Sequence, residues 1–143
     1  MIRGYMAGLP GRRRPFPHAI LEFPTLDHRQ LDVEFLIDTG ADRSVLSPKD
    51  AQRLGVDVAA LPAGQPTVGV GGRMETFMVP AILNLEEYSV SLELTILSPG
   101  RSSMPIPSLL GRNILSRFAL FFEERTERVL LLEPTEADAL NLP

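Results

Sequence analysis

A single Asp-Thr-Gly tripeptide at residues 38–40 constrains this chain more than any other feature. It directly follows the apolar residues Phe35, Leu36 and Ile37, and Gly40 allows the backbone to turn sharply after that run. General acid-base hydrolysis by paired carboxylates needs two acids that are close enough to share a proton. Because the tripeptide occurs once, a site of this kind would require a second copy of the chain.

Length and composition limit the classes of protein that the chain can belong to. Its 143 residues, 44% hydrophobic and 22% charged, match one ordinary globular domain, whereas two lobes would need roughly twice the length. A net charge of -4 provides no electrostatic basis for binding nucleic acid. The absence of cysteine excludes a disulfide framework and a thiol nucleophile.

Neither a secretion signal nor a membrane span is evident. Glycines interrupt the first ten residues, which therefore lack the continuous apolar core of a signal peptide. No apolar stretch is long enough to cross a bilayer. We expect a soluble, cytoplasmic protein with no nucleic-acid and no membrane partner.

The distribution of proline, glycine and arginine predicts three regions. Residues 8–17 are rich in all three, which disfavours regular hydrogen bonding and predicts a flexible arm over residues 1–17, with its arginines solvated. The folded domain is expected over residues 18–134. Residues 135–143 are acidic and are expected to form a loose C-terminal tail.

Apolar runs and alternations within the domain predict a mainly β fold with one or two short helices. Residues 88–97 alternate apolar and polar side chains, as in a strand with one buried face. Ser47 is a candidate helix N-cap before Pro48, and Gly55 is a candidate stop for a short helix over residues 49–54. Strands are expected at residues 19–23, 31–37, 81–85, 88–97, 108–110, 120–122 and 129–132, with a glycine-rich hairpin in residues 67–79 and a loop at residues 99–107.

A second strand-to-glycine element accompanies the first. Leu109 and Leu110 lead into Gly111, Arg112 and Asn113, and a brief helix is expected after the glycine. An isolated Asp-Thr-Gly occurs by chance in roughly 3% of chains of this length at average residue usage. Two matching elements in one short chain are therefore much stronger evidence than the tripeptide alone.

These two elements resemble the retropepsin family of aspartic peptidases, and the likeness extends from about residue 19 to residue 132. The resemblance implies a single-lobed acid protease barrel that forms a homodimer, with the active site on the two-fold axis. It also implies an aspartic endopeptidase that hydrolyses polypeptides between mostly apolar side chains. No cofactor or metal is implied.

The resemblance assigns roles to individual positions. Asp38 becomes the catalytic acid, and one copy from each protomer activates a shared water. Thr39 bonds across the dimer axis, Gly40 offers backbone groups to the substrate, and Asp42 forms a bidentate pair with Arg112 that ties the active-site loop to the short helix. Residues 68–76 become a flap over bound peptide, and the expected substrate-binding residues are Ala41, Val68, Gly69, Val70, Gly71, Gly72, Leu109 and Leu110.

Physical chemistry is consistent with these roles. Two carboxylates about 3 Å apart cannot both ionise easily, so they hold one proton between them. One acid can then act as a base while the other donates a proton. Glycines at the tip of a hairpin let it bend when it closes over a substrate.

Simpler readings of the same residues remain open. Asp38 could simply be a turn-forming residue with no catalytic role, and the glycine-rich hairpin could be an ordinary hairpin that covers no substrate. His18 and His28 are too few for a metal centre, and no Gly-x-Ser-x-Gly elbow supports a serine hydrolase. The alternative function is a weak or inactive homodimeric scaffolding module that binds an extended peptide by strand addition. The intact Asp38, Thr39 and Gly40 argue against it.

Overall fold

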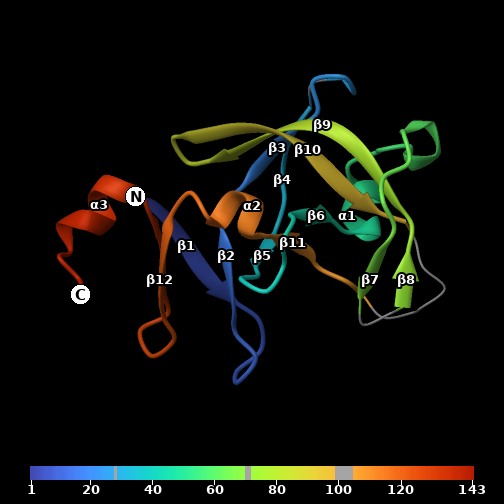
Figure 1. Cartoon of the computed structure of the whole chain (residues 1–143). Helices are drawn as coiled ribbons and strands as arrows, with labels where there is room; N and C mark the ends of the chain where they lie inside the picture. The colour runs from blue at the N-terminus through green and yellow to red at the C-terminus, as the bar shows by residue number, and fades with distance from the viewer. Residues whose placement is uncertain (28, 70–71, 99–104) are drawn as a thin grey trace.

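The computed structural model describes residues 1–27, 29–69, 72–98 and 105–143. Strands in this part of the chain form one seven-stranded sheet, one four-stranded sheet and a separate hairpin (Figure 1). The fold is mainly β, as the sequence predicts. In the seven-stranded sheet the order is β4 (Gln30–Asp32), β3 (Ile20–Glu22), β9 (Thr76–Leu85), β10 (Tyr88–Leu97), β6 (Val45–Leu46), β11 (Ser108–Leu110) and β5 (Phe35–Ile37).

The core lies against the inner face of the seven-stranded sheet. Alternate residues of its strands are buried there, because side chains along a strand point to opposite faces. The alternation predicted for residues 88–97 holds as far as Glu93, but Thr95 and Leu97 are also buried. Among the largest fully buried side chains are Leu21, Phe35, Leu46, Leu83, Leu94, Ile96 and Leu110.

The strand expected over residues 31–37 is in fact two strands. β4 pairs with β3 on one side of the sheet, whereas β5 pairs with β11 at the far edge. Buried Val33, whose N–H donates to the carbonyl of Ala19 at 3.1 Å, lies between them. The apolar pattern is continuous across this change of partner, so the sequence could not reveal it.

The N-terminal segment is a hairpin and not the flexible arm that we expected. β1 (Ile2–Ala7) pairs with β2 (Arg14–Pro17) and also with β13 (Arg128–Leu132). The prolines of β2 are tolerated because this strand lies at the edge of a four-stranded sheet, in which the order is β12 (Ala119–Glu123), β13, β1 and β2. No further partner at this edge needs their missing N–H. Ile2 and Met6 are buried in the core, which explains why the segment folds with the domain.

Arg13 is also not simply solvated. It donates to Glu127 at 2.6 and 2.9 Å, and to the carbonyls of Met6 and Gly8 at 3.2 and 3.1 Å. These bonds join the turn of the N-terminal hairpin to the turn between β12 (Ala119–Glu123) and β13. The hydrogen bond from Arg13 lowers the pKa of Glu127 below its ordinary value.

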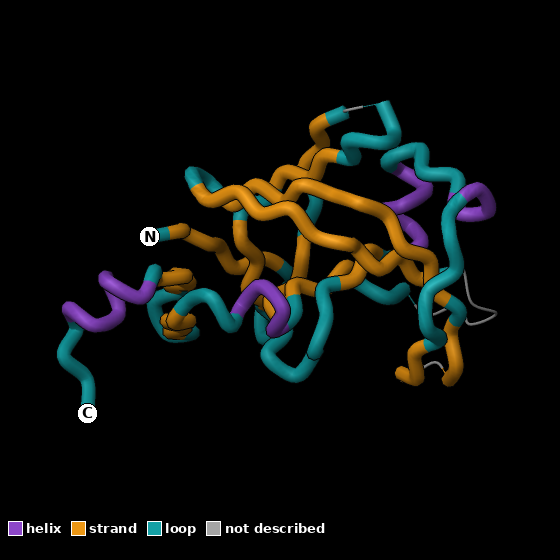
Figure 2. The backbone as a smooth tube through the Cα atoms, turned by 45° about the horizontal axis from the view of Figure 1, so that its top comes forward, coloured by secondary structure: helices purple, strands orange, loops and turns teal. Residues whose placement is uncertain are grey.

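The C-terminal residues likewise contain a helix where we expected a loose tail. α3 (Pro134–Ala139) begins with a capping box, in which Glu136 accepts from the backbone N–H of Glu133 at 2.8 Å. The amino group of Met1 contacts Glu136 at 2.7 Å. Figure 2 shows this helix at the same end of the molecule as the N-terminus. In both Figure 1 and Figure 2, β7 (Thr67–Gly69) and β8 (Gly72–Met74) lie at the opposite end.

The two helices predicted by the sequence are present. α1 (Pro48–Arg53) starts at Ser47, whose Oγ accepts from the N–H of Asp50 at 3.1 Å, and Gly55 follows its end with a φ of +75°. α2 (Arg112–Leu115) starts at Gly111. A short 3-10 helix, η1 (Val58–Ala60), was not expected. No helix in the described residues is long and apolar enough to span a membrane.

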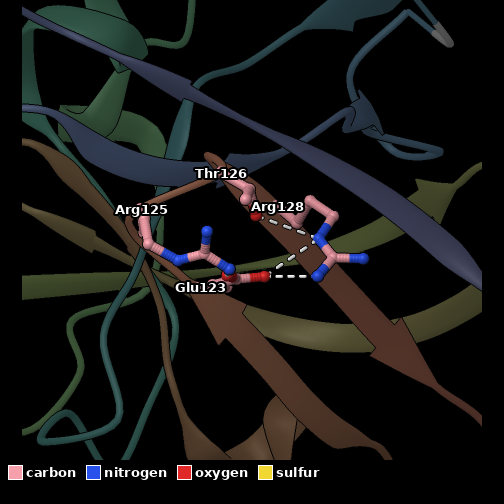
Figure 3. A network of polar contacts seen from close by, with 4 residues as sticks. All are labelled: Glu123, Arg125, Thr126 and Arg128. Atoms are coloured by element: carbon pink, nitrogen blue, oxygen red, sulfur yellow. Dashed lines mark hydrogen bonds and ion pairs between the residues drawn. The ribbon is translucent and has the colours of Figure 1, made fainter.

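The β12–β13 hairpin agrees with the sequence prediction, and an ion-pair network supports its turn. Glu123 accepts hydrogen bonds from Arg125, at 2.7 Å, and from Arg128, which also donates to Thr126 at 3.0 Å (Figure 3). The bond from Arg128 is the main reason why the pKa of Glu123 lies below its ordinary value.

Candidate active site

The two strand-to-glycine elements meet in space. β11 lies between β5 and β6, parallel to β5 and antiparallel to β6, with Leu110 opposite Ile37. Asp38 directly follows β5, and its N–H donates to the carbonyl of Leu110 at 3.0 Å. The loop from Asp38 to Ser44 therefore crosses the end of β11, where Gly111 starts α2.

Local hydrogen bonds orient the Asp38 carboxylate. Oδ1 of Asp38 accepts from the backbone N–H of Gly40 at 2.9 Å. The backbone carbonyl of Asp38 accepts from the N–H of Ala41 at 3.2 Å. Asp38 is half-buried, whereas Thr39 and Gly40 are exposed. A Cβ at residue 40 would lie 3.3 Å from Oδ1, so a glycine leaves the carboxylate undisturbed.

A buried hydroxyl that the sequence analysis missed joins the loop to α2. Ser44 is 2% exposed, and its Oγ accepts from the N–H of Gly111 at 2.9 Å and donates to Oδ1 of Asn113 at 2.8 Å. The same Oδ1 accepts from the N–H of Ser44 at 2.8 Å. Ser44 carries no periodic or motif signal, because its role depends on residues 67 and 69 positions away along the chain.

Backbone packing adds to this attachment. The N–H of Arg112 donates to the carbonyl of Ala41 at 2.8 Å, and that of Asn113 donates to the carbonyl of Asp42 at 3.1 Å. A Cβ at residue 111 would lie 2.5 Å from the carbonyl carbon and oxygen of Arg43. Only glycine permits this approach of the loop to the start of α2.

The expected ion pair between Asp42 and Arg112 forms, with a different character. Nη2 of Arg112 donates to Oδ1 of Asp42 in one hydrogen bond, not the bidentate contact that we expected. The two side chains are 77% and 61% exposed. An exposed pair of this kind contributes little to stability in a single protomer.

A cavity of about 660 Å³ lies beside the loop. One wall is formed by the loop from Asp38 to Ser44, which we call the active-site loop, and by residues of β6, β10 and β11. Residues 105–107 and the hairpin of β7 (Thr67–Gly69) and β8 (Gly72–Met74) also line the cavity. The size falls in the range of pockets that bind small organic ligands. The lining residues are Gly40, Ala41, Asp42, Arg43, Val45, Gln65, Pro66, Thr67, Val68, Met74, Thr76, Thr95, Leu97, Pro105, Ile106, Pro107 and Leu109.

Three of the expected substrate-binding residues, Ala41, Val68 and Leu109, line this cavity. Leu110 does not, because it points to the opposite face of β11 and is 0% exposed in the core; this is a correction to our expectation. The glycine-tipped hairpin is present, with Gly69 opposite Gly72, while Val70 and Gly71 lie outside the described residues. The sequence analysis did not single out Arg43, Val45, Thr95 or Leu97. Val45 and Thr95 come together at the cavity through the pairing of β6 with β10.

The base of the hairpin is fixed to the sheet. Oγ1 of Thr76 donates to the carbonyl of Gln65 at 2.7 Å, and the N–H of Gly64 donates to the carbonyl of Thr76 at 2.8 Å. These bonds join the two legs of the hairpin at its base, where Gln65 and Thr76 also line the cavity.

His18 does not line this cavity. His18 is exposed and packs its ring on Tyr5, with ring centroids 4.7 Å apart, and His28 lies outside the described residues. No group of three or more histidine, aspartate or glutamate side chains in the described part of the chain is arranged to hold a metal ion.

Comparison with solved structures defines the class of fold. The chain is similar to the EIAV protease in complex with an inhibitor, with a TM-score of 0.56 and 24% identity over 77% of this chain and 92% of that one. It is also similar to a retropepsin-like aspartic protease from Rickettsia conorii, with a TM-score of 0.58 and 20% identity over 80% of this chain and 88% of that one. The fold is therefore retropepsin-like.

Comparison of sequences defines the family. The family profile described as "Aspartyl protease" matches residues 25–114, a span that includes both Asp38 and Arg112. The chain belongs to this aspartyl protease family. No curated protein sequence matches it.

Proposed function

We propose that this protein is an aspartic endopeptidase whose active site forms when two copies of the chain bring their Asp38 side chains together. The observation that carries the proposal is the position of Asp38 at the end of β5. There its carboxylate is oriented by Gly40, which lines a cavity together with residues of the β7–β8 hairpin. No cofactor is needed.

The need for a second copy follows from the single acid. One protomer supplies one Asp-Thr-Gly, and a two-fold axis close to Asp38 would place two such carboxylates side by side. The exposure of Thr39 and Gly40 in the isolated protomer supports this arrangement, since both would be covered by the partner or by substrate.

The reaction proceeds through a water molecule held between the two carboxylates. The ionised Asp38 takes a proton from the water, whose oxygen attacks the carbonyl carbon of the peptide bond, while the protonated Asp38 donates its proton to the carbonyl oxygen. Collapse of the tetrahedral intermediate returns a proton to the leaving nitrogen, and the C–N bond breaks. In this scheme the N–H of Gly40 stabilises the negative charge on Oδ1.

Asp38→Asn tests the proposal. The variant keeps the shape of the side chain but cannot share a proton, so cleavage of a mixed peptide library at mildly acidic pH should fall at least about 100-fold. Asp138→Asn in α3 is the matched control and should cleave like the wild type. Sedimentation should show the same dimer mass for all three proteins.

Mixing the two chains tests whether the acids act together. In an equal mixture of wild type and Asp38→Asn, about one dimer in four holds two intact acids, if the chains exchange freely. Activity per wild-type chain should then fall to about half. Cleavage that is unchanged in Asp38→Asn, or full activity from a monomer, would refute the shared dyad; dimers that bind peptides without cutting them would favour the scaffolding alternative.

A further inference from the structure

The two charged residues that line the cavity differ in whether another side chain pairs with them. Asp42 and Arg43 are the charged residues among its described lining residues. Asp42 accepts a hydrogen bond from Arg112, which offsets its charge. No ion pair or hydrogen bond in the described part of the chain engages the guanidinium of Arg43, which is exposed. The cavity therefore offers one uncompensated positive charge.

The backbone that carries Arg43 is fixed. Its carbonyl packs against Gly111, so closely that a Cβ there would clash, and the next residue, Ser44, is bonded to Gly111 and Asn113. The carbonyl of Arg43 therefore faces the start of α2, and the residue also lines the cavity. An arginine held on a rigid loop loses little backbone freedom when it binds an anion.

Most of the remaining wall is apolar. Val45, Met74, Leu97 and Leu109 contribute aliphatic or thioether surface to the same cavity. A chemically matched occupant has a short apolar stem and an anionic head, which describes a glutamate or an aspartate side chain. An arginine also binds carboxylates with directed, charge-assisted hydrogen bonds.

We infer that Arg43 selects polypeptide substrates that carry an acidic side chain near the cleaved bond. This inference rests on the proposed function, because it assumes that the cavity holds substrate side chains. In a two-fold dimer each protomer supplies one Arg43, so the preference applies at two positions, one on each side of the cleaved bond. Arg43 is a substrate-binding residue and takes no part in proton transfer.

Matched peptides test the inference. Each peptide carries Glu, Gln or Lys at one position around the cleaved bond, and kcat/KM is compared at constant ionic strength. For the wild type we expect the Glu peptide to exceed the Gln peptide by about 3- to 10-fold at the positions that face Arg43. The preference should weaken as salt is raised, because the guanidinium is partly exposed.

Substitution at residue 43 should change this preference and leave the chemistry intact. Arg43→Glu should reverse the order in favour of the Lys peptide, Arg43→Gln should abolish the preference, and Arg43→Lys should retain part of it. Lys49→Glu is the matched control, since it makes the same change in net charge at an exposed position of α1 that does not line the cavity. It should keep the wild-type order.

Equal rates for Glu and Gln peptides at every position, or a Glu preference that survives in Arg43→Glu, would overturn the inference. So would the same reversal in Lys49→Glu, which would indicate an effect of net charge alone. Binding of the same peptides to Asp38→Asn separates the two proposals. If peptides bind with an Arg43-dependent preference for acidic side chains but the wild type cleaves none of them, the proposed chemistry is contradicted and the proposed selectivity is supported.

Discussion

The buried hydroxyl of Ser44 provides a direct test of how the active-site loop is held. Ser44→Ala removes the oxygen that accepts from the N–H of Gly111 at 2.9 Å and donates to Asn113 at 2.8 Å. Asn113 keeps its bond from the backbone N–H of residue 44. The N–H of Gly111 lies in a buried residue, where water cannot easily replace the lost acceptor.

The expected cost follows from these two lost bonds. A net intramolecular hydrogen bond contributes about 1 kcal/mol, and a buried donor left without a partner costs about 1–3 kcal/mol. We therefore expect Ser44→Ala to lower the free energy of unfolding by about 2–4 kcal/mol. For a chain of 143 residues this corresponds to a fall in Tm of about 5–15 °C.

Urea denaturation measures this effect, with the midpoint and slope determined for each variant. Ser91→Ala, at an exposed position of β10, is the matched control and should change stability by less than about 0.5 kcal/mol. Ser44→Thr keeps the hydroxyl and should recover part of the loss. If Ser44→Ala were no less stable than Ser91→Ala, the hydrogen-bonded attachment of the loop to α2 would be refuted.

Two other perturbations examine the surroundings of the site and the β12–β13 turn. Gly111→Ala should destabilise the fold by about 1–3 kcal/mol and lower kcat/KM, because its Cβ would lie 2.5 Å from the backbone of Arg43; wild-type stability in urea would contradict this contact. Arg128→Gln should raise the pKa of Glu123 toward its ordinary value, since the hydrogen bond from Arg128 is what mainly lowers it. The stabilising contribution of that pair is present above the ordinary pKa of a glutamate and is lost as the pH falls through the lowered one; an unchanged carboxyl titration by NMR would rule it out.

Local patterns predicted much of the fold correctly. The cap at Ser47 and the stop at Gly55 delimit α1, and the alternation of residues 88–97 reflects the buried face of most of β10. These features depend on neighbours a few residues away. The N-terminal hairpin was missed because its prolines and arginines suggest disorder, whereas the pairing of β1 with β13 joins residues at opposite ends of the chain.

In the candidate site, too, the sequence predicted what depends on neighbouring residues and missed what depends on the sheet. Ala41, Val68 and Leu109, which the motifs singled out, line the cavity, and Asp38 lies two residues before Gly40, which also lines it. The resemblance also assigned Leu110 to substrate binding, but side chains alternate between the two faces of a strand, and Leu110 lies in the core. Which of Leu109 and Leu110 faces the cavity could be decided only from the orientation of β11 in the sheet.

By itself, the sequence determined the aspartyl protease family, whose profile matches residues 25–114, and the mainly β fold, because motifs and apolar alternation depend on residues that are close together along the chain. The tertiary structure alone decided that β11 would insert between β5 and β6. That insertion brings Ser44 to Gly111 and places Arg43 beside the cavity. The physical reason is that these strands are far apart along the chain. Several segments with similar apolar patterns could pair with β11, and only the packing of the whole core selects β5 and β6.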